Sequence, residues 1–165
     1  MAIIKSVLIL SIIAGSVFIG ACSSEPDFAA NNTAANVSTK IPEESLPKTN
    51  AEELGMLIQL PYEVEDIVWE QDHVTHNITA ILRFSSEDAN KLVAEAEKYG
   101  AGRAVSVSGE SWYPDELIAQ VEMSGDSTLK GTAFPANAFF QAPYTSGRVT
   151  RVEGVDYFIL EVSSK

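Results

Sequence analysis

Apolar positions recur at helical spacing in residues 85–99 and predict the main helix of the chain there. Ser85 stands three positions before Asp88, which is a variant of the capping box that begins many helices. Gly100 follows the segment and marks its end. The apolar positions on one helical face are Ala89, Leu92, Val93, Ala96 and Tyr99. We expect this face to pack on the core of a domain.

A shorter second helix is predicted at about 114–122. Pro114 suits a helix start, because its backbone angle is already helical and its missing N–H is not needed there. Asp115 and Glu116 place negative charge in the first turn, where the helix dipole favours it. The inward positions are expected to be Leu117, Ile118 and Val121.

Alternation of apolar and polar residues predicts strands in the rest of residues 51–165. A first strand is expected in segment 74–84, and shorter ones at 103–109 and at 128–134, where Pro135 ends the pattern. In the first of these strands the positions that share a face are Val74, Ile78, Ala80 and Leu82.

Segment 147–162 predicts a β-hairpin that turns at Glu153-Gly154. Its second arm, from Tyr157 to Val162, is apolar on both faces, so it belongs in the centre of the sheet. The pattern therefore predicts an α+β domain with a mostly antiparallel β-sheet and the 85–99 helix packed on one face.

The N-terminal segment has a different character. Lys5 gives the chain a positive start, and residues 6–21 carry no charge and are mostly apolar. About 18 apolar residues or more are needed to span a bilayer. This run is slightly shorter and ends in small residues, which is the pattern of a cleaved secretory signal peptide. An uncleaved membrane anchor is the alternative.

The sequence Ile19-Gly20-Ala21-Cys22 ends that run. An aliphatic residue, two small residues and a cysteine in this place resemble the lipobox of bacterial lipoproteins. The resemblance implies cleavage before Cys22 and attachment of lipid to it, and several acyl chains make a stable anchor. Because Ser23 follows, and not aspartate, the resemblance favours the outer membrane in a host that has one. The alternative is a chance cysteine after an ordinary signal peptide; a redox thiol is disfavoured, because no histidine or second cysteine lies nearby.

These observations divide the chain into three parts. Residues 1–21 are the predicted signal peptide, residues 22–50 the lipidated cysteine with a disordered linker, and residues 51–165 the α+β domain. The linker is rich in Ala, Asn, Ser, Thr, Pro and Glu and lacks any apolar period, so it cannot bury enough surface to fold. Residues 51–165 resemble no characterised family.

The chain is acidic, with 11 Lys and Arg against 23 Asp and Glu and a net charge of −12. This balance argues against nucleic acid as a partner, because phosphate binding depends on Lys and Arg. Residues 51–72 hold seven acidic residues and no basic one. Glu63 and Glu65 are expected on a solvated strand face; a docking surface for a basic partner and a calcium site are the alternatives.

Both histidines lie close to carboxylates, in Asp72-His73-Val74-Thr75-His76, which suggests a metal site. On a strand, however, His73 and His76 point to opposite faces. We expect His76 to be a partly buried histidine on the Val74 face and His73 to lie at a hairpin turn. No cofactor is predicted, and a metal site of His73, His76 and Asp72 is the alternative.

Aromatic residues gather in two segments without periodicity, and two arginines follow the second segment. They either close the ends of the core or form a patch for a protein, peptide or glycan partner. The residues of this candidate patch are Trp112, Tyr113, Phe139, Phe140, Tyr144, Arg148 and Arg151.

The sequence favours a non-enzymatic role for the domain, in binding, assembly or maintenance of the envelope. "GESWY" at 109–113 matches a nucleophile elbow only in part, and no phosphate-binding loop is present. A small metal-assisted envelope enzyme is one alternative, and an inhibitor of a secreted enzyme is another.

Overall fold

The computed structural model describes residues 46–164. The predicted signal peptide, Cys22, Ser23 and most of the predicted linker lie outside the described residues. Among residues 46–164, no helix is long and apolar enough to cross a membrane.

The described residues form an α+β domain in which 24% is helical and 38% is strand, which confirms the predicted fold class. Its elements, in chain order, are α1 (Ala51–Gly55), β1 (Asp66–Gln71), β2 (Ile78–Arg83), α2 (Ser86–Ala96), β3 (Arg103–Ser108), α3 (Asp115–Ser124), β4 (Thr128–Pro135), the 3-10 helix η1 (Asn137–Phe139), β5 (Tyr144–Val152) and β6 (Tyr157–Ser164).

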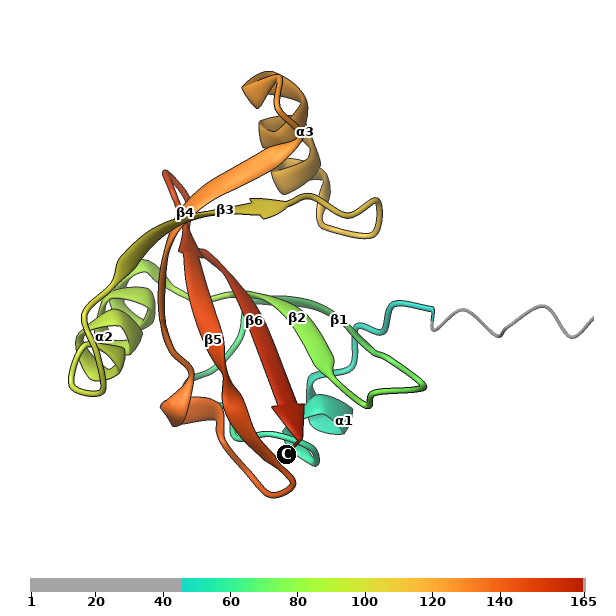
Figure 1. Ribbon diagram of the computed structural model, residues 1–165, viewed down its shortest axis with the longest axis vertical. Helices are drawn as coiled ribbons and strands as arrows, with labels where there is room; N and C mark the ends of the chain where they lie inside the picture. Colours follow the sequence, from blue (N-terminus) through green and yellow to red (C-terminus); the bar gives the residue numbers. More distant parts are fainter. Residues whose placement is uncertain (1–45, 165) are drawn as a thin grey trace, which may run out of the picture. The chain divides into compact units, whose positions relative to one another are not determined.

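The six strands form one antiparallel sheet in the order β1-β2-β6-β5-β4-β3 (Figure 1). The second arm of the predicted hairpin, β6, lies between β2 and β5, so its central place is confirmed. The hairpin turns between Val152 and Tyr157, as expected. The strands at the two edges are β1 and β3.

Both faces of the sheet carry a hydrophobic cluster, because successive apolar side chains of the central strands point to opposite faces. From β6, Phe158 and Leu160 point to one face and Tyr157 and Ile159 to the other. The larger cluster, which we call the α2-side core, packs α1, α2 and η1 against the sheet. The smaller cluster, the α3-side core, is covered by Leu117 of α3 and by the segment before it. In Figure 1, α3 lies at the end of the domain opposite to α1.

Helix α2 begins as the sequence predicts. The Ser85 hydroxyl accepts a hydrogen bond from the Asp88 N–H at 3.1 Å, and Ala89, Leu92 and Ala96 are buried. The helix ends at Ala96, however, and Tyr99 is 56% exposed. The second predicted helix is α3, which starts directly after Pro114 and ends at Ser124, where Gly125 caps it in a left-handed conformation.

The domain begins earlier than residue 51. Lys48 exchanges two backbone hydrogen bonds with Trp69 of β1, at 2.7 and 2.8 Å. The Asn50 side chain caps α1 by accepting from the Glu53 N–H. The C-terminal end of the predicted linker therefore belongs to the folded domain. Glu63 and Glu65 precede β1 and lie outside any strand.

Candidate functional site

The predicted face of Val74 and His76 is wrong. The β1–β2 ladder ends at the Gln71–Ile78 pair, and the residues between them form an exposed turn. The Asp72 carboxylate holds this turn by accepting hydrogen bonds from the N–H groups of Val74 and Thr75 and from the Thr75 hydroxyl, at 2.6 to 2.9 Å. Val74 is 87% exposed.

Both histidines are exposed in that turn, and His76 has a backbone φ of 59°. His73 lies at the hairpin turn, as predicted, but His76 is not the buried histidine that the alternating pattern suggested. The Asp72 carboxylate accepts hydrogen bonds from Thr75 and Val74, and these hold the pKa of the carboxyl below its ordinary value. No group of three or more His, Cys, Asp or Glu within residues 46–164 is arranged to hold a metal ion.

The structure divides the candidate aromatic patch between the two faces of the sheet. Tyr113 is buried in the α3-side core, where Trp112 packs edge-on against it with the ring centres 4.7 Å apart. Phe139 and Tyr144 are buried in the α2-side core, and Phe140 packs against that core. Burial raises the pKa of the Tyr113 hydroxyl, with Glu110 adding to the effect. These aromatic residues therefore close the two cores, as the first of the two interpretations expects.

The two arginines of the predicted patch also lie on opposite faces and have carboxylate partners. Arg148 forms a two-pronged ion pair with Glu161 of the neighbouring strand. Arg151 donates to Asp156 at 2.8 Å and to the Asn90 side chain of α2 at 3.0 Å. The hydrogen bond from Ser86, followed by that from Arg151, lowers the pKa of Asp156. The seven residues do not form one surface.

A different feature stands out at the edge of the sheet. Strand β3 pairs only with β4 among the described residues, and four of its six residues are exposed. The register places Ser106 opposite Lys130 and Ser108 opposite Thr128. The outer side of β3 is therefore an open strand edge.

Two hydrogen bonds fix which backbone groups of β3 face outward. Beyond the end of the ladder, the Gly109 N–H donates to the Ser127 carbonyl. Hydrogen-bonded pairs alternate along an antiparallel ladder, so the inward residues are Val107, Val105 and Arg103. On the other side of β4, the Glu153 N–H donates to the Lys130 carbonyl, which agrees with this alternation. The N–H and C=O groups of Ala104, Ser106 and Ser108 therefore point away from β4.

The two edges of the sheet differ in how far the outer backbone groups of the edge strand are covered. The backbone of Lys48 covers part of the β1 edge with its two hydrogen bonds to Trp69. Proteins usually protect open edges with lysine, proline or a bulge, because unpaired strands attract other strands. From Ala104 to Ser108, β3 contains no charged residue, no proline and no register shift. Such an edge is suited to pairing with another strand.

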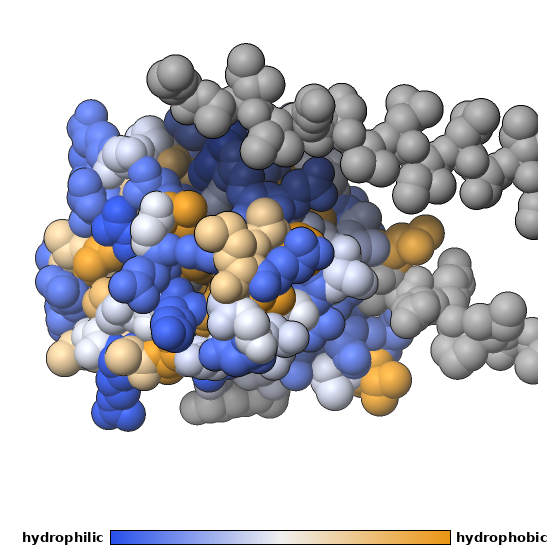
Figure 2. Space-filling view, turned by 90° about the horizontal axis from the view of Figure 1, so that it is seen from above, coloured by the Kyte–Doolittle hydropathy of each residue, from blue (hydrophilic) through white to orange (hydrophobic). Residues whose placement is uncertain are grey.

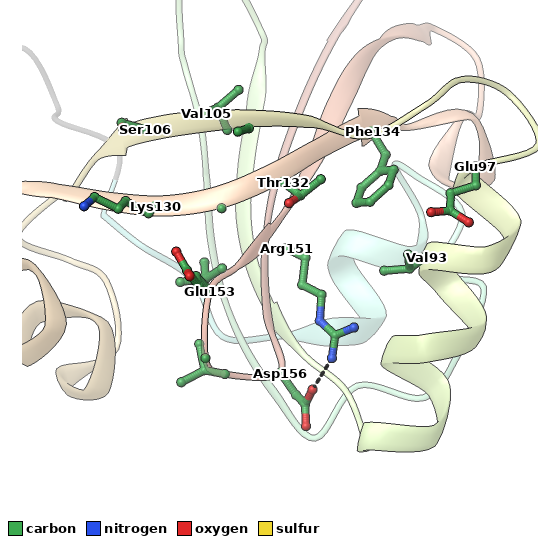
Figure 3. Close-up of a pocket in the computed structure, with 15 residues that line it drawn as sticks. Val93, Glu97, Val105, Ser106, Lys130, Thr132, Phe134, Arg151, Glu153 and Asp156 are labelled. Atoms are coloured by element: carbon green, nitrogen blue, oxygen red, sulfur yellow. Dashed lines mark hydrogen bonds and ion pairs between the residues drawn. The ribbon is translucent and has the colours of Figure 1, made fainter.

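A cleft of about 980 Å³ lies beside β3, on the α2 side of the sheet. Figure 3 shows its walls: β3 and β4 with Ser106 and Thr132, the end of α2 with Val93 and Glu97, and the turn between β5 and β6. The face seen in Figure 2 mixes hydrophilic and hydrophobic residues, without one large apolar area in the part drawn in colour. Because β3 forms one wall of the cleft, the cleft and the open edge are adjacent, and together they form the candidate site.

The charged groups of the cleft are only partly paired. Arg151 is neutralised by Asp156, as the dashed line in Figure 3 marks. Within residues 46–164, Glu97, Glu153 and Lys130 form no ion pair within 4.0 Å. The cleft therefore offers two carboxylates and one ammonium group to a ligand.

Reasoning from the sequence missed this site. The segment "RAVSVSG" at 103–109 was recognised as a strand, but its place at the edge depends on the order of strands that are distant in sequence. One feature could have indicated it: small uncharged residues alternate with valine from Ala104 to Ser108. A strand with little bulk on one side is suited to close approach by another chain.

Comparison with known proteins adds no relative: no family model matches the chain, and no curated protein or solved structure is significantly similar to it.

Proposed function

We propose that this chain is a bacterial envelope lipoprotein, anchored by lipid on Cys22, whose domain binds an extended segment of a protein partner by adding it as a strand to β3. The role is non-enzymatic. Support for the anchor comes from the lipobox resemblance at Ile19 to Cys22, and Ser23 favours the outer membrane. Support for the binding mode comes from the open edge.

The outward backbone groups of Ala104, Ser106 and Ser108 are the observation that carries the proposal. An extended peptide that pairs with β3 satisfies them with main-chain hydrogen bonds, and side-chain pockets beside the edge supply the specificity. The cleft provides such a pocket on the α2 side. On the other side Val107, which packs against the α3-side core, offers a half-buried apolar contact.

Proline at position 106 tests this mode of binding. The ring removes an outward N–H but leaves the bonds between β3 and β4 intact, and proline is tolerated at such edge positions. The probes are capped synthetic peptides that alternate valine with lysine, glutamate, serine or leucine, titrated against the full-length protein in detergent. We expect at least one peptide to bind, and Ser106→Pro to weaken it about tenfold through the lost hydrogen bond and the added bulk.

Ser106→Thr is the matched control, because it keeps the N–H and suits a strand, and it should bind as the parent does. If Ser106→Pro does not fold, as judged by its thermal unfolding, Ser108→Pro makes the same test one pair further along. Binding that survives proline at the outward positions, or the failure of all four peptides to bind, would contradict the proposal.

A further inference from the structure

We infer that the bound segment carries a basic side chain at the position beside Ala104, pointing into the cleft. This inference rests on the proposed strand addition at β3. It assigns a partner chemistry, a lysine- or arginine-containing extended segment of a protein, and a register to the site.

The pleat of the sheet determines which side chains of the added strand enter the cleft. Ala104 and Ser106 line the cleft, whereas the side chain of Val107 points to the α3-side core. An added strand continues this alternation, so every second side chain of it faces the cleft. Because Ala104 and Ser106 are small, they leave room there for a long neighbour.

The two ends of the cleft differ in charge. Near Ala104, whose cross-strand neighbour Thr132 is uncharged, the wall is formed by Val93, Phe134 and Glu97. Figure 3 shows these last three side chains close together on the α2 side. Arg151, the next residue across the sheet from Thr132, also lines this end, but its charge is paired with Asp156. Near Ser106 the cross-strand neighbour is Lys130, which disfavours a second cation and lies next to Glu153, whose N–H donates to the Lys130 carbonyl. The Ala104 end is therefore the place for a basic group.

Both the apolar stem and the charged head of a lysine or arginine fit the Ala104 end of the cleft. The apolar stem can lie along Val93 and Phe134, and the charged head can reach the carboxylate of Glu97, which is exposed and forms no ion pair within residues 46–164. Arginine gains further if it stacks on the Phe134 ring.

The net charge of the domain also favours a basic segment. Residues 46–164 contain eight Lys and Arg and nineteen Asp and Glu, a net charge of −11. This field attracts a basic segment and speeds its association at low salt. It opposes pairing of β3 with β3 of a second copy, because both domains carry the same large negative charge. The favoured occupant is therefore a foreign basic segment.

Charge variants at Glu97 test the inference. The valine–lysine and valine–glutamate peptides are titrated against the full-length protein and two variants. We expect the lysine peptide to bind more tightly, Glu97→Gln to weaken it about two- to fivefold, and Glu97→Lys to move the preference towards the glutamate peptide. Glu63→Gln, an exposed carboxylate outside the cleft, is the control and should change nothing.

Three outcomes contradict the inference; the first leaves the proposed function standing, and the other two remove it. If both peptides bind equally at every Glu97 variant while Ser106→Pro still weakens binding, strand addition stands and the basic register is wrong. If the protein sediments as a dimer that Ser106→Pro dissociates, the edge is filled by a second copy. If neither peptide is bound, and Ser106→Pro has no effect on any probe, strand addition fails as well.

Discussion

Asp72 shows how one side chain can override a pattern that extends over several residues. Apolar alternation would continue the strand through Val74. The carboxylate instead accepts hydrogen bonds from the N–H groups of Val74 and Thr75, and these bonds stabilise a turn. Local hydrogen bonding of this kind competes directly with strand pairing. The same turn carries His73 and His76 into solvent, so the metal-site hypothesis fails to find support at its own residues.

The charge on Asp72 should stabilise the protein in a pH-dependent way. Its pKa is lower in the folded chain than in the unfolded one, because hydrogen bonds from Thr75 and Val74 favour the carboxylate. The stabilisation is therefore present above the ordinary carboxyl range, near pH 4, and is lost as the pH falls through the lower folded value. Asp72→Asn keeps the acceptor oxygen but not the charge.

We expect the difference in urea midpoint between the parent protein and Asp72→Asn to be larger at neutral pH than below about pH 4. Glu63→Gln, at an exposed position outside any helix or strand, serves as the control. An equal difference at both pH values would show that the Asp72 charge does not contribute.

At the scale of elements, α2 depends on its first hydrogen bond. The Ser85 hydroxyl accepts from the Asp88 N–H, one of the four donors that have no partner within a helix. Ser85→Ala should therefore lower the free energy of unfolding by about 1 kcal/mol, whereas Ser85→Thr should retain most of it. Denaturant unfolding followed by circular dichroism measures both. A loss in Ser85→Thr as large as that in Ser85→Ala would contradict this role of the hydroxyl.

The elements that sequence reasoning predicted well are those determined by local chemistry. The capping of α2 by Ser85, the start of α3 after Pro114 and the turn at Glu153-Gly154 each depend on residues that are close in sequence. The central place of β6 followed from its apolar character on both faces.

Features that depend on distant partners were not predictable in the same way. Helix α1 has only five residues, and its buried Leu54 gains its environment from the α2-side core. Trp112 and Phe139 belong to different faces of the sheet, because the connections that carry them, from β3 to α3 and from β4 to β5, pass over opposite faces. For the same reason the open edge of β3 could be recognised only once its neighbours were known.

For the whole molecule, the lipid anchor and the open edge make separate predictions. Cys22→Ala should release the chain from the membrane fraction, because a single cysteine provides the thioether and several acyl chains provide the binding energy. Cell fractionation with immunodetection measures the distribution. Ser23→Ala, which keeps the cysteine, should stay in the membrane. Equal retention of Cys22→Ala and the parent would contradict lipid anchoring.

On the proposed function, the lipid anchor would hold a domain with an open strand edge at a membrane surface. The acidic character of the domain favours basic segments and disfavours association with anionic lipid headgroups. A domain with this charge would bind a basic partner in preference to an anionic membrane surface.

Amide hydrogen exchange along β3 tests the central claim most directly, in the isotope-labelled full-length protein with and without the valine–lysine peptide. In the free protein, Ala104, Ser106 and Ser108 should exchange rapidly, because their N–H groups face outward, while Val105 and Val107 should be slow. Saturation with the peptide should slow the three outward amides as well. Slow exchange of these three amides in the free protein, or no change when the peptide is bound, would contradict strand addition at β3.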